Sequence, residues 1–98
     1  MVEENDWEIV EIDARVTETN DLWWKYAWKL TLKSTGDTDH AFEATIEFQD
    51  ADGFVIDTSQ DPDVFLSAGQ EKTFTGYALV RLPGAERIAR SKAKVRSR

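Results

Sequence analysis

Residues 24–32 alternate almost perfectly between apolar and polar side chains. The even positions hold large apolar residues, and the odd positions hold short or charged ones: Trp24, Tyr26, Trp28, Leu30 and Leu32 against Lys25, Ala27, Lys29 and Thr31. Because successive side chains of a strand point to opposite faces, this pattern predicts a strand with one dry face and one wet face. A strand of this kind needs an apolar partner layer, which the rest of the chain is expected to supply.

Further alternating segments follow along the chain, separated by runs of Asp, Ser, Thr and Gly. We expect strands at residues 7–16, 24–33, 40–49, 54–56, 64–66, 72–80 and 90–96. Residues 57–63 are polar apart from Pro62, so they are expected to form a surface loop, and residues 85–89 one helical turn. About seven short strands separated by turns predict an all-β fold, an antiparallel sandwich of immunoglobulin-like architecture.

The first expected strand has a slip in its alternation. Trp7 and Ile9 share one parity, whereas the alternate apolar residues from Val10 to Val16 share the other. A slip of one residue turns every later side chain to the opposite face. The sequence therefore predicts either a bulge near Ile9–Val10 or a strand that passes from one sheet to the other.

Length and composition favour one domain covering residues 1–98, with residues 1–5 frayed. The chain has no cysteine, which excludes disulfides and thiolate metal sites, so an apolar core must hold the fold together. Twelve large side chains are expected in that core: Trp24, Tyr26, Trp28, Leu30, Leu32, Phe42, Ile46, Phe48, Ile56, Leu66, Phe74 and Val80.

The net charge of −7 is unevenly distributed. Residues 81–98 contain seven basic residues and one acidic residue, a net +6, whereas residues 1–80 contain five basic and eighteen acidic residues, a net −13. An acidic body argues against nucleic acid or an anionic membrane as the main partner. The basic end is interpreted as the outer face of a last strand beside acidic neighbours, with a contact patch as the alternative.

No stretch of the sequence approaches the roughly 20 apolar residues of a membrane span. The segment from Met1 to Asp6 is acidic, unlike the start of a signal peptide. These features are consistent with a cytoplasmic protein, or with a mature fragment whose leader or anchor was left out. We expect a monomer that needs no cofactor.

Three segments of the chain carry a resemblance to a known family. They are the aromatic strand 26–35, the strand and Asp-Gly turn at 46–56, and the segment Leu66–Phe74. Together they resemble FxLYD-type domains of bacterial and archaeal cell-envelope proteins. The resemblance implies a small immunoglobulin-like sandwich without catalytic residues, in a protein that commonly carries a signal sequence, lipoprotein anchor or transmembrane helix. This chain departs from that pattern because it shows no anchor and has Ser34 where asparagine is typical.

The closest approach to a metal-binding motif is an acidic turn at residues 50–63. Asp50, Asp52 and Asp57 are candidate ligands, because calcium prefers carboxylate and carbonyl oxygens. However, Gly53 comes too early for a calcium loop, and the closing glutamate is missing. The favoured interpretation is therefore turn formation by Asp and Gly, with calcium binding as the alternative.

The aromatic residues give the best indication of a binding site. Trp23 has the opposite parity to Trp24, and an exposed Trp23 beside Lys25 and Tyr77 could stack on a sugar ring or anchor a protein. The alternative is that Trp23 covers the rim of the sandwich. Tyr77 and Leu79 have the opposite parity to Phe74 and Val80, which predicts that this strand is covered on both faces near its end.

No pattern in the sequence supports catalysis. His40 is the single histidine, so no histidine pair is available, and a triad would need a base held by a third group. Glu43 and Glu47 share one strand face, but paired carboxylates for glycoside hydrolysis need a cleft that a sandwich of 98 residues hardly offers. The sequence thus predicts a non-catalytic interaction or structural module of a cell-envelope or secreted protein, with a carbohydrate-binding module as the alternative and a small hydrolase as the least favoured one.

Overall fold

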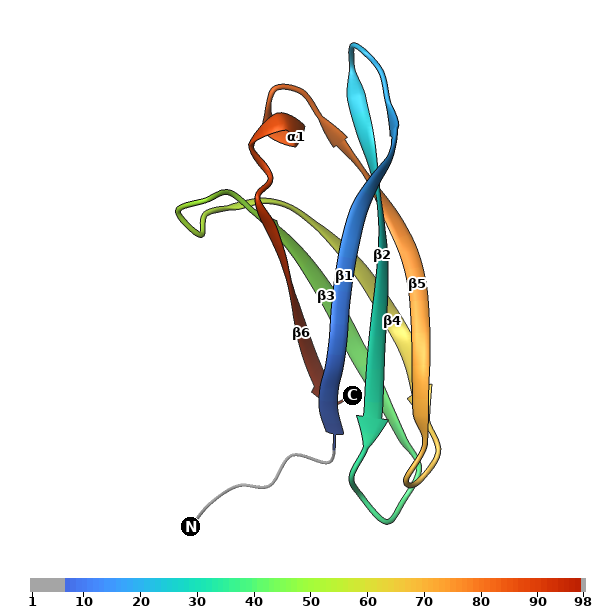
Figure 1. Cartoon of the computed structure of the whole chain (residues 1–98). Helices are drawn as coiled ribbons and strands as arrows, with labels where there is room; N and C mark the ends of the chain where they lie inside the picture. The colour runs from blue at the N-terminus through green and yellow to red at the C-terminus, as the bar shows by residue number, and fades with distance from the viewer. Residues whose placement is uncertain (1–6, 98) are drawn as a thin grey trace.

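The computed structural model describes residues 7–97, which form six strands and one short helix. The elements are β1 (Trp7–Thr19), β2 (Trp23–Ser34), β3 (His40–Gln49), β4 (Val55–Leu66), β5 (Glu71–Arg81), α1 (Gly84–Arg87) and β6 (Arg90–Ser97). Two antiparallel sheets, sheet A (order β1-β2-β5) and sheet B (order β4-β3-β6), lie face to face (Figure 1). The predicted all-β sandwich is confirmed.

Strand β4 differs from the prediction in its extent. The two short strands expected at 54–56 and 64–66 are its two ends, and residues 57–61, expected in a loop, pair with β3 from Phe48 back to Ala44. The pairing shifts between Asp61 and Val64, so β4 consists of two segments. Counted separately, these segments give the seven strands that the sequence predicts.

The predicted bulge in β1 is confirmed. The register with β2 shifts between Ile9 and Glu11, so Val10 has no opposite partner. Ile9 lies opposite Leu32 and Ile12 opposite Leu30, which places apolar residues from both sides of the slip on the inward face. A second shift, between Val16 and Glu18, was not predicted.

The core lies between the sheets and follows the alternation of β2 and β3. Nine of the twelve predicted core residues are buried, and the other three, Trp24, Ile56 and Phe74, are half-buried against the same cluster. Four smaller residues that were not predicted complete it: Ala44, Val64, Ala85 and Ala93. Trp28 is 4% exposed, as the alternation of β2 requires.

Two contacts fix how neighbouring elements pack. The Trp28 indole lies over Gly76 of β5, where an added Cβ would come within 2.7 Å of the indole Cε2, and its Nε1 donates to Ser59 Oγ of β4 at 3.0 Å. The buried Tyr26 hydroxyl donates to the carbonyl of Ala85 at 2.7 Å and ties α1 to sheet A. The predicted helical turn therefore exists, at Gly84–Arg87.

Strand β6 explains the basic end of the chain. Its residues pair with β3, and Lys94 and Arg96 form ion pairs with Glu47 (3.1 Å) and Glu43 (2.5 Å). The basic residues at 90–96 thus lie on the outer face of an edge strand beside acidic neighbours, as predicted, whereas Arg81 and Arg87 belong to β5 and α1. Within residues 7–97, no helix has the length and apolar character that crossing a membrane requires.

Candidate binding face on sheet A

The three residues predicted to bind lie together on the outer face of sheet A. Trp23 and Lys25 belong to β2, and Tyr77 belongs to β5 opposite Ala27. Directly opposed residues of an antiparallel pair point to the same face, so all three side chains point away from the core. Trp23 and Lys25 are half-buried, whereas Tyr77 is 59% exposed.

A cation–π contact organises this group. Lys25 Nζ lies 4.4 Å from the centroid of the Tyr77 ring. The ammonium occupies one face of the ring, and the remaining ring surface faces solvent. Lys25 thus contacts an exposed aromatic side chain of the neighbouring strand.

Leu79 and Arg81 extend the group along β5, and the sequence did not identify them as site residues. Leu79 lies opposite Lys25 and is 49% exposed, and Arg81 lies opposite Trp23. Leu79 shares the parity of Tyr77, which was the signal available in the sequence. We call Trp23, Lys25, Tyr77 and Leu79 the aromatic face.

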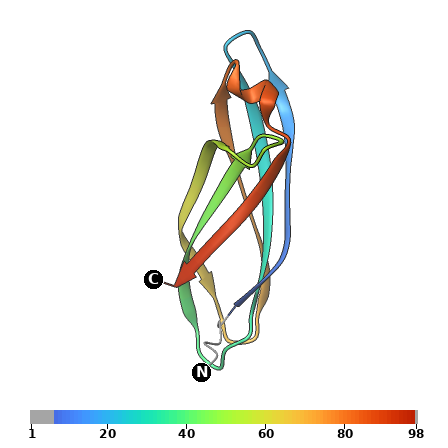
Figure 2. The same cartoon turned by 90° about the vertical axis from the view of Figure 1, so that its left-hand side faces the viewer.

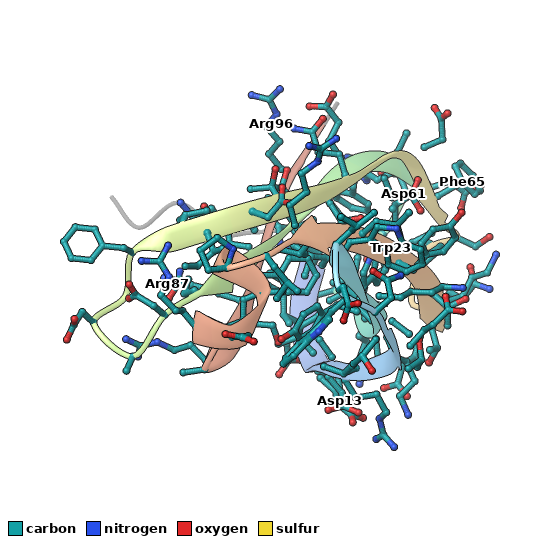
Figure 3. All side chains as sticks on the ribbon, turned by 90° about the horizontal axis from the view of Figure 1, so that it is seen from above. Asp13, Trp23, Asp61, Phe65, Arg87 and Arg96 are labelled. Atoms are coloured by element: carbon teal, nitrogen blue, oxygen red, sulfur yellow. The ribbon has the colours of Figure 1, made fainter. Side chains whose placement is uncertain are left out.

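The expectation that β5 is covered on both faces near its end is wrong. Val80 is buried by the core, whereas Tyr77 and Leu79 stay open to solvent in the part of the chain that the structure describes. Figure 3 shows the two outer surfaces of the sandwich on opposite sides, with Arg96 projecting from sheet B and Asp13 from sheet A.

The acidic turn at residues 50–54 is held by its own side chain. Asp50 Oδ1 accepts hydrogen bonds from the N–H groups of Asp52 and Phe54, each at 2.9 Å, and Gly53 has a φ of +90°. Asp57 Oδ1 accepts the N–H of Thr58 at 2.8 Å. This is the turn formation that the sequence favoured.

The three proposed calcium ligands are not gathered into a cluster. Within residues 7–97, no group of three or more histidine, aspartate or glutamate side chains has an arrangement that could hold a metal ion. Calcium binding by Asp50, Asp52 and Asp57 stays a prediction, and amide shifts of residues 50–63 during a calcium titration are its test.

The residues considered for catalysis have structural surroundings. His40 is half-buried at the rim of the core, where its ring stacks on Phe42 with centroids 5.9 Å apart. Glu43 and Glu47 lie on the outer face of sheet B, each paired with a basic residue of β6. The Lys94 ammonium bonded to Glu47 lowers the pKa of that carboxyl below its usual 4.5, which favours the charged form.

Comparisons with known proteins show similarity in fold, but not in sequence family. No protein-family model matches the sequence, and no curated protein does either. The FxLYD resemblance is therefore not confirmed, whereas similarity to sandwich domains of solved structures is. This chain is a small β-sandwich domain.

Two of the similar solved structures are large hydrolases. A β-glucuronidase from glycoside hydrolase family 2 matches with a TM-score of 0.67 and 15% identity over 76% of this chain. A calcium-binding mutant of Bacteroides uniformis β-glucuronidase 2 matches with a TM-score of 0.69 and 18% identity over 89% of this chain. The chain spans only 8% and 11% of these two proteins, respectively.

The third structure is of similar size to this chain. It is a DUF1425 family member from Shewanella sp. pv-4, with a TM-score of 0.56 and 16% identity, covering 98% of this chain and 93% of that one. The same fold thus occurs both as a small part of long enzymes and as nearly a whole chain. At these identities, the similarity carries no activity from one protein to another.

Proposed function

We propose that this chain is a non-catalytic interaction module that binds a protein partner through the aromatic face of sheet A. The observation that supports this proposal is the exposure of Tyr77 and Leu79 beside Trp23 and Lys25. Aromatic and aliphatic side chains next to a cation are the composition that protein interfaces favour. The FxLYD resemblance supports placing such a module in a cell-envelope or secreted protein.

A carbohydrate-binding module is less well supported by the same geometry. A sugar ring stacks on an open aromatic face, but Lys25 occupies one face of Tyr77 and Trp23 is half-buried. The match to β-glucuronidases covers about a tenth of those chains and shows the fold alone. Protein recognition is therefore the better proposal.

Site-specific photo-crosslinking tests the proposal. A photoreactive phenylalanine analogue placed at Leu79 is compared with the same analogue at Phe65 on sheet B, because the two positions are equally exposed, at 49% and 51%. After irradiation of cells that express the chain, we expect a discrete protein adduct from position 79 and none from position 65. Equal adducts from both positions, or none from either, would overturn the proposal.

A further inference from the structure

The edges of the two sheets differ in how they are protected against pairing with another strand. Unpaired edges invite strand addition, and proteins block them with bulges, charges or short strands. The edge strand β1 has two register shifts, and so has the pairing of the edge strand β4. Strand β6 presents Arg90, Lys92, Lys94 and Arg96 along its length. Three of the four edges thus carry a recognised protecting device.

Strand β5 has no bulge over its last residues, and from Tyr77 onward its one charged residue is the terminal Arg81. Its pairing with β2 runs without a shift from Glu71 to Arg81. Leu82 N donates to Leu22 O at 3.1 Å, which continues the hydrogen-bonded pairs formed by the even-numbered residues. In antiparallel pairing, hydrogen-bonded and non-bonded pairs alternate. The N–H and C=O groups of Tyr77, Leu79 and Arg81 therefore point away from β2, toward the open edge.

Strand β4 closes only the lower part of this edge. Ser59 Oγ of β4 donates to the Tyr77 carbonyl of β5 at 3.3 Å. From their shared turn at residues 67–70, β4 and β5 diverge toward the end that carries α1 (Figures 1 and 2). A groove remains there. Its lining comes from the turn before β4 (Asp50 and Phe54), from β4 (Val55, Ile56 and Asp57), from β5 (Val80 and Arg81) and from α1 (Gly84 and Arg87).

The basic and acidic residues of this groove lie on different sides of it. Arg81 and Arg87 form no ion pair within residues 7–97, and they lie on the β5 and α1 side. The two carboxylates of the groove, Asp57 of β4 and Asp50 of the turn before it, already accept backbone N–H groups. In a chain of net charge −7, two arginines without ion pairs beside an open strand edge favour a partner carboxylate.

We propose that the edge of β5 from Tyr77 to Arg81 takes an extended acidic peptide segment of a partner protein as a fourth strand of sheet A. This inference rests on the proposed function and names how its partner binds. Side chains of the added strand alternate in direction. One set contacts Tyr77 and Leu79 on the aromatic face and places a carboxylate on Arg81 beside them. The other set enters the groove over Val55, Ile56 and Val80, with a carboxylate on Arg87.

The test uses linear peptides selected from a random phage-displayed library on the whole chain. Selected sequences should alternate apolar residues and contain Asp or Glu. Titrated into the labelled protein, they should slow hydrogen exchange at the amides of Leu79 and Arg81. Binding should weaken about tenfold or more in Leu79→Pro, which removes an outward N–H and keeps the ladder to β2, and in Arg87→Glu.

Controls distinguish a variant that no longer binds peptide at the β5 edge from a variant that no longer folds. Lys92→Glu makes the same kind of charge change on β6 and should leave peptide affinity unchanged, and each variant is checked for an unaltered thermal transition. If Leu79→Pro fails to fold, two other measurements test strand addition: hydrogen exchange at the Leu79 amide of the wild-type chain and the peptide affinity of Arg87→Glu. Failure to select any peptide, or peptides that bind without slowing these amides, would overturn strand addition. The crosslink at position 79 would still test the aromatic face independently.

Discussion

At the scale of single residues, the tightest constraint is the space above Gly76. A methyl group there would lie 2.7 Å from Cε2 of the buried Trp28 indole. Because Trp28 also donates to Ser59, its ring cannot move without losing that hydrogen bond. Gly76→Ala should therefore destabilise the chain by about 1–3 kcal/mol through overpacking, as measured by urea denaturation. Thr75→Ala, on the exposed face of the same strand, should change stability by less than about 0.5 kcal/mol. Equal effects of the two would contradict this packing.

Single side chains also show how far the sequence predicts the binding face. The parity of Trp23 and Lys25 places them outward from the sequence alone, because Trp24 and Tyr26 must face the core. Their meeting with Leu79 and Arg81 depends on the pairing of Trp23 with Arg81, which lies far away in the sequence. The local alternation of side chains predicts which face of the sheet a residue lies on. Its neighbours on the adjacent strand depend on the register between segments that are distant in the sequence.

At the scale of elements, one hydrogen bond positions α1. The Tyr26 hydroxyl donates to the Ala85 carbonyl at 2.7 Å in a buried setting, and the same burial raises the pKa of Tyr26 above its usual 10.0. Tyr26→Phe leaves that carbonyl with only a long bond from Ile88 N, at 3.4 Å. We expect a loss of about 1–3 kcal/mol by chemical denaturation. Tyr77→Phe is the matched control, since its hydroxyl is exposed and should matter little.

The ion pair between β3 and β6 on the outer face of sheet B predicts that the stability of the fold depends on pH. Because Lys94 lowers the pKa of Glu47 below 4.5 in the folded chain, the ion pair stabilises the fold above pH 4.5. This contribution is lost as the pH falls through the lowered value. The melting temperatures of wild type and Glu47→Gln should therefore differ at pH 7 and converge well below pH 4.5. Lys94→Met should remove the same dependence, and a constant difference between wild type and Glu47→Gln would contradict it.

Strand β4 shows why one element was predicted with the wrong extent. Residues 57–63 look like a loop because almost none is apolar, yet Asp57, Ser59 and Asp61 occupy inward positions of an edge strand. These positions are half-buried at the rim of the sandwich, and Ser59 accepts the Trp28 indole N–H. Backbone pairing with β3 and one side-chain partner thus replace the apolar pattern from which strands are predicted.

At the scale of the whole molecule, the two sheets share one core and should unfold together. Phe48 of sheet B packs on Tyr26 of sheet A with ring centroids 5.5 Å apart, and both belong to the same buried cluster. All four tryptophans lie in β1 and β2, so tryptophan fluorescence reports on sheet A and on the contacts that Trp7 and Trp28 make with sheet B. A substitution in sheet B that shifts this signal shows that the sheets are coupled.

Phe48 is therefore the residue that tests this coupling. Phe48→Ala should cost about 3–5 kcal/mol, close to the whole stability of a small domain, so the milder Phe48→Leu, at roughly 1 kcal/mol, suits equilibrium measurements. Its urea midpoint should fall equally by fluorescence, whose tryptophans all belong to sheet A, and by far-ultraviolet circular dichroism, which monitors the strands of both sheets. Phe65→Ala, at an exposed position of sheet B, should leave both midpoints nearly unchanged. If the fluorescence midpoint of Phe48→Leu equals that of the wild type while its dichroism midpoint falls, sheet A folds without sheet B. The dry face of β2 would then not need sheet B to cover it.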